Sequence, residues 1–247
     1  MSDGLEPMPE DWQRLLAIVA HPDDLEYGAA SAIARWTGAG KSVGYAIVTD
    51  GEAGIDGVAP DEAGLIRRRE QVASARVVGV EDVSFLGHPD GTVAAGAGLR
   101  RDLARQIRRI RPDVLLTTTY DLTYGLPGQD PILNQADHRV VGVAVLDAAR
   151  DAANRWIFPE LLEEGLDPWP GVTHVYVMGS NRPTHAVDVT DTLGAGIESL
   201  EAHCAYLEGL GRDFDPSEFL RAMTVDPGRT LGVGHAVAFG RVQLAGV

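Results

Sequence analysis

The chain is poor in cysteine and in positive charge. Cys204 is the only cysteine among 247 residues, which excludes a disulfide framework or a cysteine-ligated metal cluster within the chain. We expect this thiol to be buried as a small apolar group. Lys and Arg total 21 against 36 Asp and Glu, and the formal net charge is −15. Such a negative surface repels phosphate groups, so nucleic acids and anionic membranes are poor partners.

Long apolar runs and several ligand-binding motifs are also missing. No apolar run approaches the ~20 residues that span a bilayer, and the acidic first twelve residues do not resemble a signal peptide. We therefore expect a cytoplasmic protein. The sequence contains no dinucleotide-binding glycine motif, no Walker A motif and no G-x-S-x-G elbow. Because no linker or repeat interrupts the chain, we expect one domain over residues 1–247.

Short apolar runs alternate with helical patterns along most of the chain. The predicted strands are residues 15–20, 43–49, 83–86, 113–118, 174–178 and 186–189, and the predicted helices are 25–36, 62–78, about 99–109, 140–149 and 193–210. This alternation predicts an α/β fold with a mostly parallel sheet and helices on both faces. The third helix carries five arginines, which we interpret as a solvated face: Arg100, Arg101, Arg105, Arg108 and Arg109.

Acidic residues and an imidazole follow the first predicted strand. Ligands of parallel α/β sheets bind beyond the carboxyl ends of the strands, where this chain has His21-Pro22-Asp23-Asp24. His21 and Asp24 are close enough to share a metal ion, and His138 is the best candidate for a third ligand. Three N/O ligands and one open position are typical of catalytic zinc, which leaves Asp23 free to act as a base. A structural alternative stays open, because Asp at the start of a helix also caps it.

Five motifs in order between residues 15 and 142 carry a family resemblance. They read VAHPDDLEYGAAS, VTDGEAG, RRRE, FLGHPDG and ADHRVVG, and a weaker echo in AVDVTDTL and SLEAHCAYL extends to about residue 207. This set closely resembles the LmbE-like (PIG-L) family of zinc-dependent N-deacetylases. The resemblance implies a Rossmann-like fold, one zinc ion per chain, and removal of an acetyl or acyl group from an amino sugar such as an N-acetylglucosaminide. Thiol-conjugate amidases belong to the same family and are an alternative.

The resemblance also implies a role for each motif residue. It makes His21, Asp24 and His138 the zinc ligands, Asp23 the general base, and Arg67 and Asp90 the sugar-binding residues. Glu52 and Tyr124 are weaker candidates for lining the pocket. Structural explanations exist for two of these residues. Arg67 can pair with Glu70 or another nearby carboxylate, and Asp90 lies in a Pro-Asp-Gly turn that favours Asp without any ligand.

One motif departs from the family pattern. Where the family has His-Pro-Asp-His, this chain has Gln135-Ala136-Asp137-His138. Gln135 cannot supply a proton, although its amide can donate a hydrogen bond to an oxyanion. Three interpretations follow: Asp23 moves the proton in both directions, another histidine (His88 or His235) replaces the acid, or the protein is weakly active or only binds a sugar or a metal.

Two further hypotheses concern other activities and partners. A glycosidase using Asp23 with Asp90 or Asp24 would need only paired carboxylates, but it leaves His21 and His138 unexplained. The expected partner is a small amino-sugar substrate. The stretch 156–170, rich in Trp and Pro, is a candidate contact in a homo-oligomer.

Overall fold

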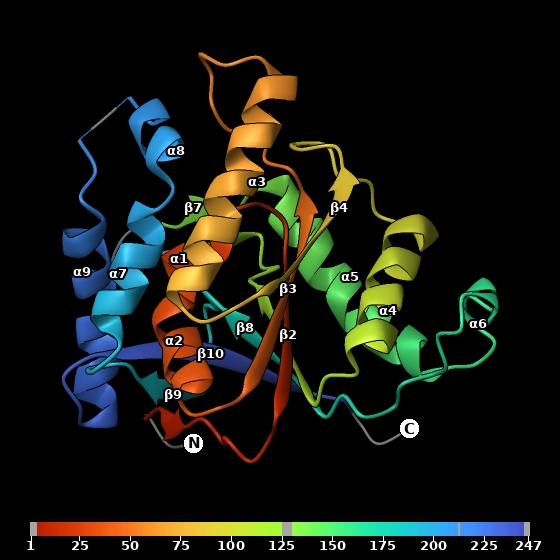
Figure 1. Ribbon diagram of the computed structural model, residues 1–247. Helices are drawn as coiled ribbons and strands as arrows, with labels where there is room; N and C mark the ends of the chain where they lie inside the picture. The colour runs from red at the N-terminus through yellow and green to blue at the C-terminus, as the bar shows by residue number, and fades with distance from the viewer. Residues whose placement is uncertain (1–3, 125–129, 212, 245–247) are drawn as a thin grey trace.

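An eight-stranded sheet forms the centre of the protein. The computed structural model describes residues 4–124, 130–211 and 213–244 (Figure 1). The strand order is β1-β9-β10-β8-β5-β2-β3-β4. The strands are β1 (Glu6–Pro7), β2 (Arg14–Val19), β3 (Ser42–Thr49), β4 (Asp82–His88), β5 (Val114–Thr118), β8 (His174–Met178), β9 (His185–Asp188) and β10 (Ala236–Gln243). Only the two pairings made by β10 are antiparallel, so the predicted mostly parallel sheet is confirmed.

Helices cover both faces of this sheet, as predicted (Figure 1). Along β2, Leu15, Ala17 and Val19 enter one core and Leu16 and Ile18 the other, because successive side chains of a strand point to opposite faces. The first core is shared with α1 (Asp24–Gly28), α2 (Ala30–Gly38) and α3 (Pro60–Val77), against which α7 (Leu193–Glu201) packs. The second core is shared with α4 (Ala97–Ile110) and α5 (Ala136–Ala153). The strand that leads to the His-Pro-Asp-Asp turn is therefore packed on both of its faces.

Two predicted helices are each divided. The predicted helix 25–36 is α1 followed by α2, with a break at Ala29, whose φ of −145° and ψ of −11° are not helical. The predicted helix 193–210 is α7 followed by α8 (Cys204–Gly209), with His203 between them. The helices on either side of the first break, α1 and α2, both pack against α7, and those on either side of the second, α7 and α8, both pack against α3.

The C-terminal elements went unpredicted. They are α9 (Pro216–Leu231) and β10. A signal for the start of α9 was present, because Asp215 accepts hydrogen bonds from the backbone N–H groups of Ser217 and Glu218 and Pro216 occupies the first turn. The strand β10 begins with the apolar run 236–239, but its position third from one edge of the sheet arises only from pairing with β8 and β9.

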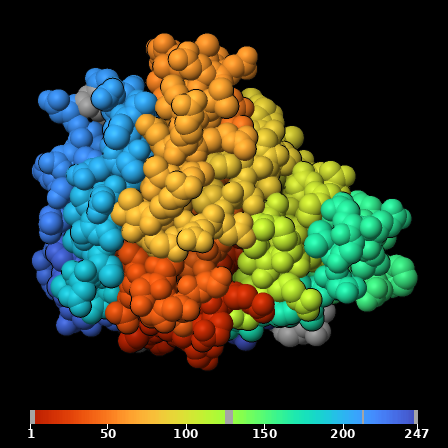
Figure 2. Space-filling view, viewed as in Figure 1, coloured from red at the N-terminus to blue at the C-terminus, as the bar shows by residue number. Residues whose placement is uncertain are grey.

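Smaller elements occupy the segments that the sequence left irregular. In the predicted loop 119–136, β6 (Thr123–Tyr124) pairs with β7 (Ile132–Leu133) as a separate two-stranded sheet. The segment 157–171 contains the single-turn α6 (Glu160–Glu163) and belongs to a projection at one side of the molecule (Figure 2). Trp156 is 79% exposed there, and its role in a subunit contact stays a prediction. Among the described residues, no helix is both long and apolar enough to cross a membrane.

Two expectations about burial were wrong. Arg108 is only 2% exposed, because the end of α4 packs against the end of α5 and its guanidinium donates to the carbonyl oxygens of Ala152 and Asn154, among others. The other arginines of α4 are half-buried or exposed, as expected. Cys204 is exposed rather than buried, because it begins the short surface helix α8, where its Sγ contacts the carbonyl oxygen of Glu201.

Candidate metal centre and active site

A tight turn follows β2 at the carboxyl edge of the sheet. Within it, Asp23 has a φ of 85° and a ψ of −22°, a left-handed conformation that is uncommon for residues other than glycine. Hydrogen bonds hold this turn. The backbone N–H of Asp23 donates to Gln71 Oε1 at 2.8 Å, and the N–H of His21 donates to Asp24 Oδ2 at 2.9 Å. The turn therefore holds the side chains of His21, Asp23 and Asp24 in defined directions.

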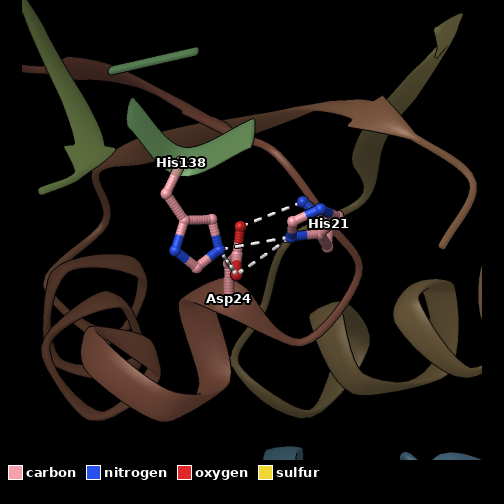
Figure 3. Close-up of side chains that lie close together, drawn as sticks. All are labelled: His21, Asp24 and His138. Carbon is pink, nitrogen blue, oxygen red and sulfur yellow. Dashed lines mark hydrogen bonds and ion pairs between the residues drawn. The ribbon is translucent and has the colours of Figure 1, made fainter. Parts of the chain in front are cut away.

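Three ligand atoms converge beside this turn (Figure 3). His138 Nε2 lies 2.9 Å from Asp24 Oδ1 and 3.2 Å from His21 Nδ1, and the latter two atoms are 3.7 Å apart. Tetrahedral ligands about 2.0–2.1 Å from zinc lie about 3.3–3.4 Å from one another, a spacing that the three observed separations bracket. The set therefore fits a zinc ion, and it is one of two groups in the described chain whose geometry could hold a metal.

The second group shares His21. Its Nε2 lies 3.1 Å from Asp90 Oδ1 and 3.4 Å from Asp137 Oδ2. Burial lowers the pKa of His21, but its contacts with Asp137, Asp24 and Asp90 outweigh burial and hold that pKa well above its usual range. Burial raises the pKa of Asp24, yet the neighbouring His138 and His21 bring it far below its usual range. The carboxylates thus make this pocket a strong attractor of positive charge.

Asp23 lies outside the three-ligand set and faces Arg67. Asp23 is 5% exposed, and its Oδ2 lies 3.4 Å from Arg67 Nη2. Burial raises the pKa of Asp23 to about 6, although the positive charge of Arg67 opposes this rise. A carboxyl group with this pKa can both accept and release a proton near neutral pH.

Arg67 is itself almost completely buried. It donates to the carbonyl oxygen of Pro22, and its guanidinium lies 3.9 Å from the ring centre of Tyr206. Its acidic partner is Asp23, whereas Glu70 accepts from the backbone N–H of Ala205. Arg67 therefore supports the turn and the carboxylate of Asp23, and its role as a sugar ligand stays a prediction.

The remaining predicted residues are arranged around this centre. Asp90 accepts from the backbone N–H of Ala53 at 2.9 Å, and its own N–H donates to Glu52 Oε1 at 2.8 Å, which joins the loops after β3 and β4. Tyr124 is half-buried on β6. Gln135 is exposed at the N-cap of α5, and its side chain makes no hydrogen bond among the described residues.

The two histidines considered as replacement acids have partners elsewhere. His88 Nε2 lies 3.2 Å from Asp102, and His235 Nδ1 lies 2.8 Å from Thr224 Oγ1. The strand that follows His235 is three positions from β2 in the sheet, a separation of about 14 Å at the usual strand spacing. Neither contact involves the three-ligand set, so the structure gives no support to the interpretation that one of them replaces the acid.

A buried polar network behind the turn was missed by the sequence analysis. Glu26, 1% exposed, accepts from Gln71 Nε2 at 2.9 Å and from Ser74 Oγ at 2.7 Å, and its second oxygen lies 3.6 Å from His203 Nε2. Through Gln71 the network reaches the backbone of Asp23. A signal was available, because residues 67, 71 and 74 repeat at helical spacing and place polar side chains on the inward face of α3.

A comparison with protein families gives this site a context. The family model described as "PIG-L: GlcNAc-PI de-N-acetylase" matches residues 16–149, which is more than half of the chain and spans β2 to α5. The chain belongs to the PIG-L family. The matched region includes the turn after β2 and the start of α5, which together supply all three converging ligands.

Two relatives and a solved structure are similar to this chain over most of their length. The diacetylchitobiose deacetylase of Thermococcus kodakarensis is 28% identical over 230 residues, 92% of this chain and 82% of that protein. The mycothiol S-conjugate amidase of Streptomyces coelicolor is 30% identical over 213 residues, 76% of this chain and 69% of that protein. The structure of N,N'-diacetylchitobiose deacetylase from Pyrococcus horikoshii has a TM-score of 0.82 and 24% identity, and the match covers 95% of this chain and 85% of that one. This last likeness confirms the fold.

Proposed function

We propose that this protein is a zinc-dependent N-deacetylase that removes an acetyl group from an N-acylated amino sugar, such as an N-acetylglucosaminide or its conjugate. The observation that carries the proposal is the convergence of His21, Asp24 and His138 at tetrahedral spacing next to the buried carboxyl group of Asp23. The family membership and a relative named as a diacetylchitobiose deacetylase support the reaction class.

The metal and the chain would have separate tasks in this reaction. A zinc ion bound by the three ligands would polarise the acyl carbonyl and lower the pKa of water to about 7. Asp23 would take the proton from the attacking water and return it to the departing amine. Burial raises the pKa of this carboxyl group to about 6 before any cation binds, and a bound cation would lower it from there, so the group stays weak enough as an acid to take up a proton and strong enough to release it. These two proton transfers need no histidine as a general acid, which agrees with the glutamine at position 135.

Other residues would position the substrate. Gln135, exposed and without a side-chain partner among the described residues, would donate its amide N–H to the oxyanion as the carbonyl becomes tetrahedral. Asp90 and Glu52, joined by a hydrogen bond, and Tyr124 on β6 would line the sugar pocket. Arg67 would act chiefly through Asp23, since its guanidinium is buried against that carboxyl group.

A second candidate activity is hydrolysis of the amide of a thiol conjugate. It is favoured by the relative named mycothiol S-conjugate amidase, whose identity of 30% is similar to that of the deacetylase. Both activities would use the same metal and base, because each breaks an amide bond by attack of water. They differ in the acyl group released, so the products separate them.

Amine release from a panel of N-acetylglucosaminides and S-conjugates tests the proposal. Metal-stripped protein and the same protein reloaded with one equivalent of zinc are compared, and acetate is measured beside the new amine. We expect zinc-dependent release of equal amounts of acetate and amine. Amine without acetate would favour the amidase. A new reducing end without amine would point to the glycosidase hypothesis. Protein that binds one zinc per chain but releases no amine from any substrate would contradict the proposed function and favour a binding protein.

A further inference from the structure

The imidazole of His138 has two nitrogens with different surroundings. Nε2 faces Asp24 and His21, whereas Nδ1 lies on the opposite side of the ring (Figure 3). That outer nitrogen lies 3.0 Å from Oδ1 of Asn134. Asn134 comes four residues before His138, just ahead of α5, and is 1% exposed. A buried amide therefore faces the nitrogen that points away from the three-ligand set.

The orientation of this amide follows from its other contacts. Asn134 Nδ2 donates to the carbonyl oxygens of Thr119 at 2.8 Å and Asp121 at 3.0 Å. Carbonyl oxygens only accept hydrogen bonds, so the NH2 group must be on their side of the amide. The atom that faces His138 is then the amide oxygen, which can only accept.

An accepting oxygen determines which nitrogen of a neutral imidazole carries the proton. Nε2 also faces an acceptor, Asp24 Oδ1, but a metal ion bound by both atoms would take the lone pair of Nε2. Asn134 Oδ1 can only accept, so the proton of a metal-bound His138 belongs on Nδ1. Nε2 is the atom that joins the three-ligand set. Metal-binding imidazoles commonly donate their other N–H to a carbonyl or carboxylate oxygen, which fixes the ring and its tautomer.

We propose that Asn134 is a positioning residue that holds His138 in the tautomer whose Nε2 is free to bind the metal ion. Asn134 also ties the loop after β5 to the metal ligand, since its two donor contacts and its backbone N–H, which donates to the carbonyl of Leu122 at 2.9 Å, all end in that loop. The inference rests on the proposed metal site but not on the identity of the substrate.

Two substitutions separate the tautomer role from simple anchoring of the loop. Asn134→Ala removes both the acceptor for His138 and the two donors to the loop. Asn134→Asp also removes the donors but keeps an acceptor against Nδ1. A matched control is Asn181→Ala, because Asn181 Nδ2 donates to the carbonyl of Thr123 in the same loop, whereas the described partners of the His138 ring are His21, Asp24 and Asn134.

Zinc affinity, measured by competition with a chelating dye, provides a readout that needs no substrate. We expect the zinc dissociation constant to rise about 10–100-fold in Asn134→Ala and to stay within about threefold of wild type in Asn134→Asp and Asn181→Ala. Equal losses of affinity in both Asn134 variants would overturn the tautomer role, because only the loop contacts are lost in common. Unchanged affinity in Asn134→Ala would overturn it as well.

Imidazole ¹⁵N–¹H correlation spectra of the zinc-loaded protein test the tautomer directly. The His138 signals are assigned by their absence in His138→Gln. We expect the proton on Nδ1 and the metal on Nε2 in wild type. Coordination through Nδ1 would overturn the inference. If zinc affinity depends on Asn134 but no substrate releases amine, the proposed function fails while the role of Asn134 stands. If amine is released but zinc affinity does not depend on Asn134, only the proposed role of Asn134 is rejected.

Discussion

Charged side chains gather at two places that differ in their access to water. In the turn after β2, Asp23, Asp24 and the facing Arg67 are each less than 10% exposed. On α4, Arg109 pairs with Asp82, and these side chains are 39% and 45% exposed. The residue types are the same in both places. In the buried group, burial raises the pKa of Asp23, whereas the neighbouring histidines bring the pKa of Asp24 far below its usual range.

The difference shows why one group can do chemistry and the other stabilises only weakly. Removal of water strengthens interactions between charges and penalises each unpaired charge. A buried carboxyl group therefore takes a pKa set by its neighbours, which is what proton transfer requires. Exposed ion pairs are screened by water and salt, and each contributes only about 0–1 kcal/mol.

The largest effect is expected from the buried base. Asp23→Asn keeps the size of the side chain and removes its ability to accept a proton. We expect kcat for amine release to fall about 10²–10⁴-fold, with zinc content unchanged because Asp23 lies outside the three-ligand set. Zinc per chain by elemental analysis is the control. An activity within a few-fold of wild type would show that Asp23 is not the base.

Arg108 tests how much burial adds to the stabilisation by an arginine of α4, because the other arginines of this helix are half-buried or exposed. Arg108→Ala leaves several buried carbonyl oxygens without a donor, including those of Ala152 and Asn154, and we expect a loss of about 3 kcal/mol in the free energy of unfolding. The neighbouring Arg109→Ala is the matched control, with an expected loss below about 1 kcal/mol. Denaturant unfolding measures both. Similar losses in the two variants would contradict the comparison.

A smaller effect is expected in the pH dependence. The base acts when ionised, so kcat/KM rises with pH through the pKa of Asp23, which is about 6 before any cation binds and lower beside a bound cation. Arg67 favours the ionised carboxylate. Arg67→Gln therefore moves the acidic limb upward by about one pH unit or more, whereas Arg67→Lys keeps the charge and moves it less. An acidic limb that does not shift in Arg67→Gln would show that Arg67 does not influence the pKa of the catalytic base.

Most of the site could be predicted because its residues come in short motifs at the ends of apolar runs. The strand before His21 and the helix after Asp137 were evident from local patterns, and the three proposed ligands lie together as expected. The contacts of the ring nitrogens outside the three-ligand set, His21 Nε2 and His138 Nδ1, could not be predicted. His21 meets Asp90 and Asp137, and His138 meets Asn134, through turns whose shapes depend on packing.

The sequence by itself determined the alternating α/β architecture, the residues at the carboxyl edge and the likeness to the PIG-L family, because period and motif are local properties. Only the tertiary structure decided which charges lose water, and hence that Arg108 is buried and that Asp23 has a raised pKa. It also decided the place of β10 and the contact of His21 with Asp137, 116 residues away. Burial and contact at such separations depend on how distant segments pack, and no local pattern records that.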